Sequence, residues 1–516
     1  MAQLFLMFLL ALSPIIWLII ALIALKQQAW IASFESLAVA VLVSMAVWHT
    51  QPLEVATAAL EGCLFALWPI CIVIIAAVFT YNLTVCTHAM DKIKQMLTSV
   101  SSDRRILTLL IVWCFGNFME GMAGFGTAVA IPASMMMALG VDPITSILAC
   151  LIANGTPTMF GSIGIPTTTL ASITGIAETE LAFVQALQVF PFVIACPFLM
   201  VMLVGGGPKA LKGIVPITLV AGLSFAIPEI LAARFIGATL PDVVGAVCSL
   251  GCTFLMALHM KDRTPVPESE RLKVAAGRGK LSAHDALVAW SPYILIFVVL
   301  ILTSPLVPAI NQPLASIKTQ LQVYAGENPA TLTFSWINTP GVLILLCGIV
   351  GGFIQGCSVR EMLSVLGATV KQMSKTILTM LGVLSVAKIM GYSGMIASIA
   401  AFFVGSLGGM YPLMAPALGA LGTFVTGSGT SSEVLFGDVQ LKAAQSLGIN
   451  ETWLVASNSL GISAGKMISP QNVAIGCAAC GLSGKDGEII GKVARYAFGF
   501  LLMMMIMTFV GVLLGL

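Results

Sequence analysis

The segment from Thr423 to Phe436 reads TFVTGSGTSSEVLF and interrupts two strongly apolar stretches. It carries Gly427, Ser428 and Gly429 in succession, then three hydroxyl side chains and the carboxylate of Glu433. At membrane depth, a broken backbone is tolerated only where protein buries it or where it lines a cavity. A half-helix that begins at such a break presents unpaired N–H groups and a positive dipole end, which favour anions. The segment therefore predicts an anion-binding site rather than a simple span.

The composition of the 516-residue chain indicates a helical membrane protein. Hydrophobic residues make up 58% of it and charged residues 9%, whereas soluble domains are about 25% charged. Apolar runs recur along the chain, and we expect roughly 12 to 14 transmembrane helices together with re-entrant or broken half-helices. The expected fold class is thus an all-α polytopic membrane protein. Because no long polar segment lies outside the membrane, an enzyme with an external catalytic domain is not expected.

Two regions of the chain resemble each other. In the first, NFMEGMAGFGTAVAIP (Asn117 to Pro132) is followed by LIANGTPTMFGSIGIP (Leu151 to Pro166). In the second, TFVTGSGTSSEVLF is followed by LVASNSLGISAGKMISP (Leu454 to Pro470), with the matching residues in the same order. Paired segments broken by Gly and Pro are typical of the repeats of secondary transporters. Chance similarity in an apolar, Gly-rich chain is the alternative.

The loops indicate the orientation of the repeats. Lys and Arg gather in the loop at 260–285, which we expect in the cytoplasm, and are sparse at 304–338, which we expect outside. Corresponding spans of the two halves then run in opposite directions, so the repeats are expected to be inverted. Glu229, near a predicted outer end of a span, is interpreted as interfacial. The expected parts are the first membrane repeat with its additional helices at 1–259, a cytoplasmic loop at 260–286 and the second membrane repeat at 287–516.

Three ionisable residues near the broken segments are candidates for function, because each costs about 2.5–3.5 kcal/mol to insert into a membrane. Glu120 directly precedes the break GMAGFG, Glu433 follows the break of the second half, and Lys466 stands between Gly465 and Pro470. A carboxylate in an apolar, partly wet cavity can carry a proton near neutral pH, or it can simply accept loop N–H groups. Lys466 is interpreted as the partner of a substrate carboxylate, of Glu120 or of Glu433, with a lysine that reaches the interface as the alternative.

Small residues, hydroxyls and amides around both breaks complete the expected site. Asn154 and Asn458, which align in the repeats, either bind a small hydroxylated anion or satisfy freed backbone groups. No catalytic residue, metal site or cofactor is expected, because the four histidines lie at span ends or in loops and no nucleotide-binding or H-E-x-x-H motif is present. The candidate substrate-binding residues are Gly124, Gly126, Thr127, Asn154, Gly427, Ser428, Thr430, Ser431, Ser432, Asn458 and Lys466, and the candidate proton-coupling residues are Glu120 and Glu433.

Four segments carry a resemblance to a known family: EGMAGFGTAVAIP (Glu120 to Pro132), LIANGTPTMFGSIGIP, TGSGTSSEVLFG (Thr426 to Gly437) and, most specifically, AGKMISPQNVAIGCAACGLSGK (Ala464 to Lys485). They resemble the lactate permease family, bacterial proton-coupled carriers of L-lactate and related 2-hydroxy monocarboxylates such as glycolate. Where the family pattern often has Asp this chain has Gly429, and where it often has Asn this chain has Glu433, so the carboxylate is shifted by about one helical turn.

The resemblance implies a multi-pass protein of the bacterial plasma membrane that imports a monocarboxylate by proton symport. Its partners would be the small anion, H⁺ and the lipid bilayer but no nucleic acid, and it would be a monomer or a homo-oligomer. The hypothesis is that the anion docks on half-helix N-termini near Gly427 to Ser432 and Gly124 to Thr127, while a proton on Glu120 or Glu433 balances the charge. The alternatives are a Na⁺-coupled carrier of another organic anion and a membrane-embedded subunit of a redox or ion-pumping complex.

Overall fold

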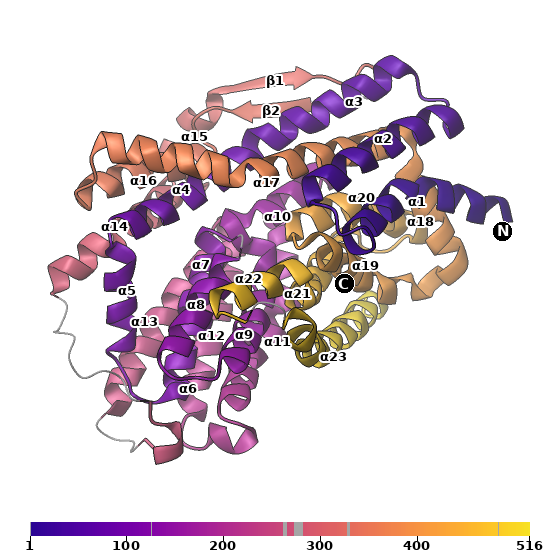
Figure 1. Ribbon diagram of the computed structural model, residues 1–516. Coiled ribbons are helices and arrows are strands. Elements are labelled where there is room, and N and C mark those ends of the chain that lie inside the picture. The colour runs from indigo at the N-terminus through magenta and orange to yellow at the C-terminus, as the bar shows by residue number, and fades with distance from the viewer. Residues whose placement is uncertain (1, 125, 262–265, 273–281, 328–330, 483–484) are drawn as a thin grey trace.

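The computed structural model describes residues 2–124, 126–261, 266–272, 282–327, 331–482 and 485–516 (Figure 1). In these residues, 11 helical segments are long and apolar enough to cross a membrane, or up to 12 if the bent pair Pro143–Gly155 and Thr158–Thr174 is one span. The predicted all-α polytopic membrane fold is therefore confirmed, and the number of spans reaches the lower end of the expected range. One small antiparallel hairpin of strands β1 (Lys318–Gln322) and β2 (Thr331–Ser335) is added to the helices.

One group of helices, the first bundle, is built around the long helix α17. Helix α17 packs along α2 and α3, while α16 packs against both α4 and α14 (Figure 1). A π-helical turn, η1 (Ala66–Cys71), joins α3 to α4, and α15 (Pro308–Ser316) leads from α14 to the strands. The first bundle consists of α2 (Ala29–Val47), α3 (Pro52–Phe65), α4 (Ile72–Cys86), α14 (Ala283–Thr303), α16 (Pro340–Ile354) and α17 (Val359–Ser393).

The other group, the second bundle, interlocks helices that lie far apart in the chain. Helix α10 packs on α20, α9 and α11 pack on α21, and α22 packs on α8. Its members are α7 (Gly116–Met122), α8 (Thr127–Ala138), α9 (Pro143–Gly155), α10 (Gly161–Thr174), α11 (Glu178–Val204), α12 (Val215–Phe235), α13 (Pro241–Lys261), α19 (Tyr411–Thr426), α20 (Gly429–Leu447), α21 (Glu451–Ile468), α22 (Pro470–Ala479) and α23 (Asp486–Leu513).

The remaining elements connect the bundles or extend their helices. Helix α1 packs against both α2 and α18, and α18 in turn contacts α20, so this pair closes one side of the molecule (Figure 1). The connecting elements are α1 (Ala2–Ile23), α5 (Ala89–Thr98), α6 (Arg104–Leu107), η2 (Thr108–Phe115), η3 (Thr158–Phe160), η4 (Pro208–Leu211), η5 (Glu268–Glu270), α18 (Met395–Leu407) and η6 (Gly408–Met410).

Both bundles draw helices from residues 1–259 and from residues 287–516. The sequence halves are therefore not separate bodies in space. The inverted relation of the two repeats stays a prediction, as does the position of the loop at 260–286 in the cytoplasm. Much of that loop, at 262–265 and 273–281, lies outside the described residues.

The span from Arg104 to Met122 lies at the centre of the second bundle and is buried along its whole apolar window. It combines α6, the π-helical segment η2 and α7. Polar side chains hold it to its neighbours: Trp113 Nε1 donates to the Ala221 carbonyl oxygen at 3.2 Å. Because protein rather than lipid surrounds this span, it can carry the ionisable side chain of Glu120.

Helices α19 and α21 approach each other closely because glycines line their contact. A Cβ added at Gly461 would lie 1.8 Å from the Pro416 carbonyl oxygen, and one added at Gly465 would lie 2.2 Å from that of Ala420. Small residues permit such contact between membrane helices, where packing replaces the hydrophobic effect as the main driving force. The contact fixes the end of α21, and therefore the residue that follows Gly465, against the second bundle.

We expect Gly461→Ala to destabilise the protein by about 1–3 kcal/mol, because the added methyl group overlaps a backbone oxygen that cannot easily move. The measurement is the thermal unfolding midpoint of the purified protein in mild detergent. Gly499→Ala is the control, since Gly499 is an exposed residue of α23 whose added Cβ has nothing within 4 Å. An equal midpoint for Gly461→Ala and Gly499→Ala would contradict the close packing of α19 on α21.

Candidate functional site

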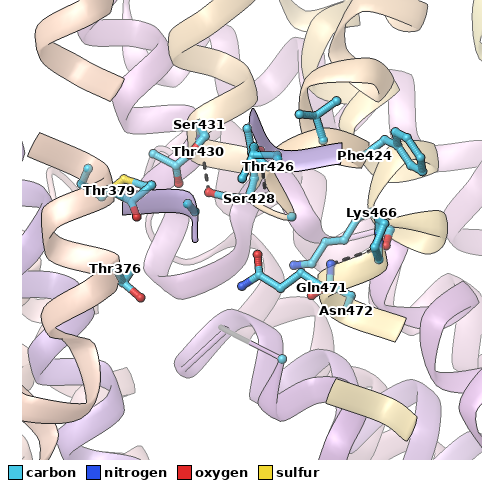
Figure 2. Close-up of a pocket in the computed structure, with 18 of the residues that line it drawn as sticks. Thr376, Thr379, Phe424, Thr426, Ser428, Thr430, Ser431, Lys466, Gln471 and Asn472 are labelled. Carbon is cyan, nitrogen blue, oxygen red and sulfur yellow. Dashed lines mark hydrogen bonds between the residues drawn. The ribbon is translucent and has the colours of Figure 1, made fainter. Parts of the chain in front are cut away.

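A cavity of about 770 Å³ lies between α17 of the first bundle and the broken helices of the second. Figure 2 shows Thr376 and Thr379 of α17 on one side of it, with Lys466 and Gln471 on the other. The break between α19 and α20 and the start of α10 form further parts of its wall. Sites for small molecules commonly have about this volume, roughly 300–1,000 Å³, so the cavity is large enough for a small anion with its water.

The break between α19 and α20 presents the first turn of α20 to this cavity. The chain turns at Gly427, where φ is 70°, and Ser428 caps α20 by accepting the Ser431 N–H on its Oγ at 3.2 Å. The residues from Ser428 to Ser431 line the cavity (Figure 2), and the buried Oγ of Ser431 has no hydrogen-bond partner in the described structure. The unpaired N–H groups of a helix start and the hydroxyls beside them form a site suited to an anion.

The first break, between α7 and α8, is more enclosed. Gly124 and Gly126 have φ values of 60° and 85°, and Thr127 begins α8 and donates from Oγ1 to the Gly124 carbonyl oxygen at 2.8 Å. Gly126 lines the cavity, whereas Gly124 lies behind it, where an added Cβ would be 2.0 Å from Ser162 Oγ. Phe125, within the same break, lies outside the described residues.

A buried ion pair joins the two halves of the chain at the cavity wall. Lys466 Nζ donates to Glu120 Oε1, and the other carboxylate oxygen accepts the Asn154 Nδ2–H at 2.7 Å. Lys466 is 7% exposed and Glu120 2%, and both line the cavity. Of the partners considered for Lys466, the structure thus provides Glu120. Pairing removes most of the cost of burying two charges, provided that further hydrogen bonds satisfy them.

Glu433 lies behind the wall, fully buried on α20. Its two oxygens accept the Asn458 Nδ2–H at 2.7 Å and the Ser459 hydroxyl. Asn458 Oδ1 in turn accepts the Gln440 Nε2–H at 3.3 Å. Asn154 and Asn458, the residues that align in the repeats, therefore each donate to a carboxylate. Ser432 is also turned to the protein and donates to the Gly419 carbonyl oxygen at 2.7 Å.

The candidate residues from the sequence thus fall into two layers, and their roles stay predictions. Those that line the cavity are Glu120, Gly126, Gly427, Ser428, Thr430, Ser431 and Lys466. Those that lie outside its lining are Gly124, Thr127, Asn154, Ser432, Glu433 and Asn458.

Several lining residues were not predicted. Gln471 and Asn472 lie in the first turn of α22, which begins at Pro470 shortly after Lys466, and the polar pair in SPQN was the signal available in the sequence. Thr376 and Thr379 come from the middle of α17, where nothing local marks them as part of a site. Within the described residues, no three His, Cys, Asp or Glu side chains are grouped so that they could hold a metal ion.

The chain is similar to known permeases over nearly its whole length. The family model described as L-lactate permease matches residues 7–515. An L-lactate permease of Streptococcus iniae is 43% identical, with 88% of this chain and 94% of that protein covered. A glycolate permease of Escherichia coli strain K12 is 32% identical, with 95% of this chain and 93% of that protein covered.

Among solved structures, the chain is similar to MtrF of Neisseria gonorrhoeae, described as one of a class of antimetabolite efflux pumps. The TM-score is 0.48 at 15% identity, with 88% of this chain and 83% of that chain covered.

The relatives are permeases, so the expectation of a transporter rather than an enzyme is confirmed. With 11 or more apolar spans, the protein is a multi-pass protein of the bacterial plasma membrane, as the sequence predicted. The match over nearly its whole length shows that the chain belongs to the L-lactate permease family.

Proposed function

We propose that this transporter imports L-lactate, or a related 2-hydroxy monocarboxylate such as glycolate, together with a proton. The observation that carries the proposal is the ion pair of Lys466 and Glu120 at the wall of a cavity. The first turn of α20 also lines this cavity. An ammonium group and a helix N-terminus both attract a carboxylate. The hydroxyls of Thr430 and Ser431 and the amides of α22 offer partners for the 2-hydroxyl group.

The charges that line the cavity fit an anion with a single carboxylate. Lys26 and Lys375 line it at exposed positions, whereas Lys466 is buried beside the helix start. One buried ammonium group balances one negative charge. A di- or tricarboxylate would bring further charges into a site with too few cations to pair with them, at a cost of several kcal/mol for each unpaired ion.

The same ion pair explains why a proton would accompany the anion. In the empty site, Glu120 neutralises Lys466. If the substrate carboxylate takes the place of Glu120 beside Lys466, a buried carboxylate is left without its cation. A proton on Glu120 removes that charge, and the retained hydrogen bond from Asn154 still holds the side chain. Anion and proton then bind together, and the site is neutral both empty and loaded.

Transport further requires that the loaded site face each side of the membrane in turn. The cavity lies between α17 and the second bundle, so we propose that movement of one bundle against the other opens and closes it. The proposed inverted repeats would supply two related conformations for this exchange.

The first test is uptake of labelled L-lactate and glycolate into proteoliposomes under an inward proton gradient. We expect uptake that a protonophore abolishes, that needs no Na⁺, and that Lys466→Ala lowers by at least about tenfold, the effect of losing 1.4 kcal/mol of binding. Lys492→Ala is the matched control, because Lys492 is an exposed residue of α23 paired with Glu488. Uptake that requires Na⁺ would contradict proton symport, and no uptake of either anion by folded protein would contradict the substrate class.

The ion pair also predicts a pattern of stability. Glu120→Gln leaves Lys466 buried without a counter-charge and should destabilise the protein by about 3–5 kcal/mol. Adding Lys466→Met removes the second charge as well, so the double variant should unfold at a higher temperature than Glu120→Gln alone. Unfolding midpoints in detergent measure both. A double variant less stable than either single variant would show that the two charges are not held as a pair.

Glu433→Gln tests which carboxylate takes the transported proton. Glutamine keeps an acceptor for Asn458 or Ser459, and Glu433 does not line the cavity. We therefore expect Glu433→Gln to retain uptake that responds to the proton gradient. Uptake that persists but no longer responds to the gradient would assign the proton to Glu433 instead of Glu120.

A further inference from the structure

Two carboxylates that the mechanism above does not use lie buried beside the site. Glu229 on α12 is 0% exposed and Asp242 on α13 is 1% exposed. The interpretation of Glu229 as interfacial was wrong, because α11 and α13 cover the face of α12 that carries it. In the described structure, none of the four carboxylate oxygens has a hydrogen-bond partner. Although Asp242 lies in the first turn of α13, it accepts no backbone N–H group there.

The packing of α12 on α13 brings these two side chains to the same level. Ser249 Oγ donates to the Ala221 carbonyl oxygen at 2.8 Å, and a Cβ added at Gly245 would lie 3.0 Å from the Phe225 carbonyl oxygen. These two contacts show that the helices run antiparallel. About one turn before Gly245 on α13, Asp242 therefore lies level with Pro228, the residue before Glu229.

Asp242 also reaches the end of α7 that carries Glu120. A Cβ added at Gly121 would lie 2.9 Å from Asp242 Oδ2, so this oxygen lies directly against the backbone next to Glu120. One turn earlier on α7, the amide of Asn117 is fully buried, and neither its oxygen nor its nitrogen has a partner in the described structure. Asp242 thus lies between α12, which carries Glu229, and the end of α7 that carries Glu120.

The groups around Asp242 provide too few positive charges for these carboxylates. On the helices packed against the start of α13, α12 carries Glu229 and α7 carries Glu120, which pairs with Lys466. From η2, the titratable group is the Cys114 thiol, which is held by Ser249, and α10 contributes no titratable side chain. Three carboxylates thus share one ammonium group, and Glu120 already pairs with it.

More distant charges on the neighbouring helices are engaged elsewhere. On α12, the guanidinium of Arg234 lies over the Phe183 ring at 5.0 Å. On α11, Glu178 accepts the Ala238 backbone N–H at 3.0 Å and Glu180 accepts the Thr452 hydroxyl at 2.8 Å. An ionised carboxylate with neither a cation nor a donor is too costly to bury, whereas a protonated one is tolerated.

A second cavity, of about 430 Å³, lies on the far side of the start of α10. Ile165 lines both cavities, and the segment Ser162–Gly164 between them has three successive left-handed residues. Ile236 and Thr239, in the turn from α12 to α13, line the second cavity, as does Ser335 of the hairpin region that the sequence predicts to lie outside. The carboxylate that lines this cavity is Glu178, and the turn that contributes Ile236 and Thr239 joins the helix of Glu229 to the helix of Asp242.

We propose that Glu229 and Asp242 are protonated carboxylic acids that relay protons from the second cavity to Glu120. Asp242 gives its proton to the Glu120 carboxylate as the anion arrives, takes one from Glu229, and Glu229 is reprotonated by water of the second cavity. The amide of Asn117 offers a donor and an acceptor along this path. The proton thus has a route of its own beside the segment that separates the two cavities. This inference rests on the proposed proton symport and names further residues that serve it.

Asp242→Asn tests the relay in two transport assays with the purified protein in proteoliposomes. An inward gradient of one pH unit should let the wild type accumulate labelled substrate about tenfold, since each proton carries 1.4 kcal/mol. We expect Asp242→Asn to accumulate none but still to exchange internal for external substrate at equal pH at nearly the wild-type rate, because exchange returns the carrier with its proton bound. Glu180→Gln, a neighbouring exposed carboxylate, should match the wild type in both assays.

Infrared spectra of the purified wild type and of each variant, compared as difference spectra, give a readout that does not depend on transport. The carbonyl band of a buried protonated carboxylic acid should be present in the wild type, weaker in Asp242→Asn, and unchanged in Glu180→Gln. Glu229→Gln should behave as Asp242→Asn does and carries the test if the latter does not fold.

Three results would overturn the relay. They are full accumulation by Asp242→Asn, loss of exchange together with accumulation in folded protein, and an unaltered carbonyl band. Absence of gradient-driven uptake in the wild type itself would overturn the proposed symport, and the infrared result would then show separately whether the two acids are protonated.

Discussion

The buried ion pair of Lys466 and Glu120 is the interaction on which the site depends. A single charge at this depth is unstable, so these side chains must meet although 346 residues separate them in the chain. The surrounding helices position both side chains. The enclosed span that ends in α7 shields Glu120 from lipid, and the glycine contact of α21 with α19 fixes the end of α21 next to Gly465. Asn154 then fixes the second carboxylate oxygen.

Buried polar groups need partners, and this also applies to the N–H and C=O groups that the backbone breaks leave without a helical partner. Hydroxyls beside each break pair with nearby backbone groups: Thr127 donates to Gly124, Thr426 donates to Gly422, and Ser428 accepts from Ser431. Ser431, whose buried hydroxyl has no partner in the described structure, is among the residues at the start of α20 that line the cavity. The proposed anion site consists of polar groups that the protein does not satisfy by itself and that a ligand can complete.

Local sequence was sufficient to locate the breaks, because Gly-rich and hydroxyl-rich runs are conspicuous in an apolar chain. It also selected Lys466 and Glu120, because charge in a span is costly. It could not show that α17 supplies Thr376 and Thr379, or that the two sequence halves share both bundles, since these depend on which helices pack together. Glu229 was misjudged for the same reason: its distance from a predicted span end was visible, but the helices that cover it were not.

The two carboxylate–amide pairs also differ in a way that bears on mechanism. Glu120 with Asn154 faces a cation, whereas Glu433 with Asn458 and Ser459 faces neutral donors. Glu433 lies just beyond the first turn of α20, the turn whose positive end faces the cavity. A negative charge there would oppose the attraction of that turn for an anion. A neutral Glu433 would therefore favour anion binding throughout the proposed cycle, whereas the proposed symport changes the charge of Glu120 within it. Lys466, which pairs with Glu120 and not with Glu433, thus distinguishes the proposed roles of the two carboxylates.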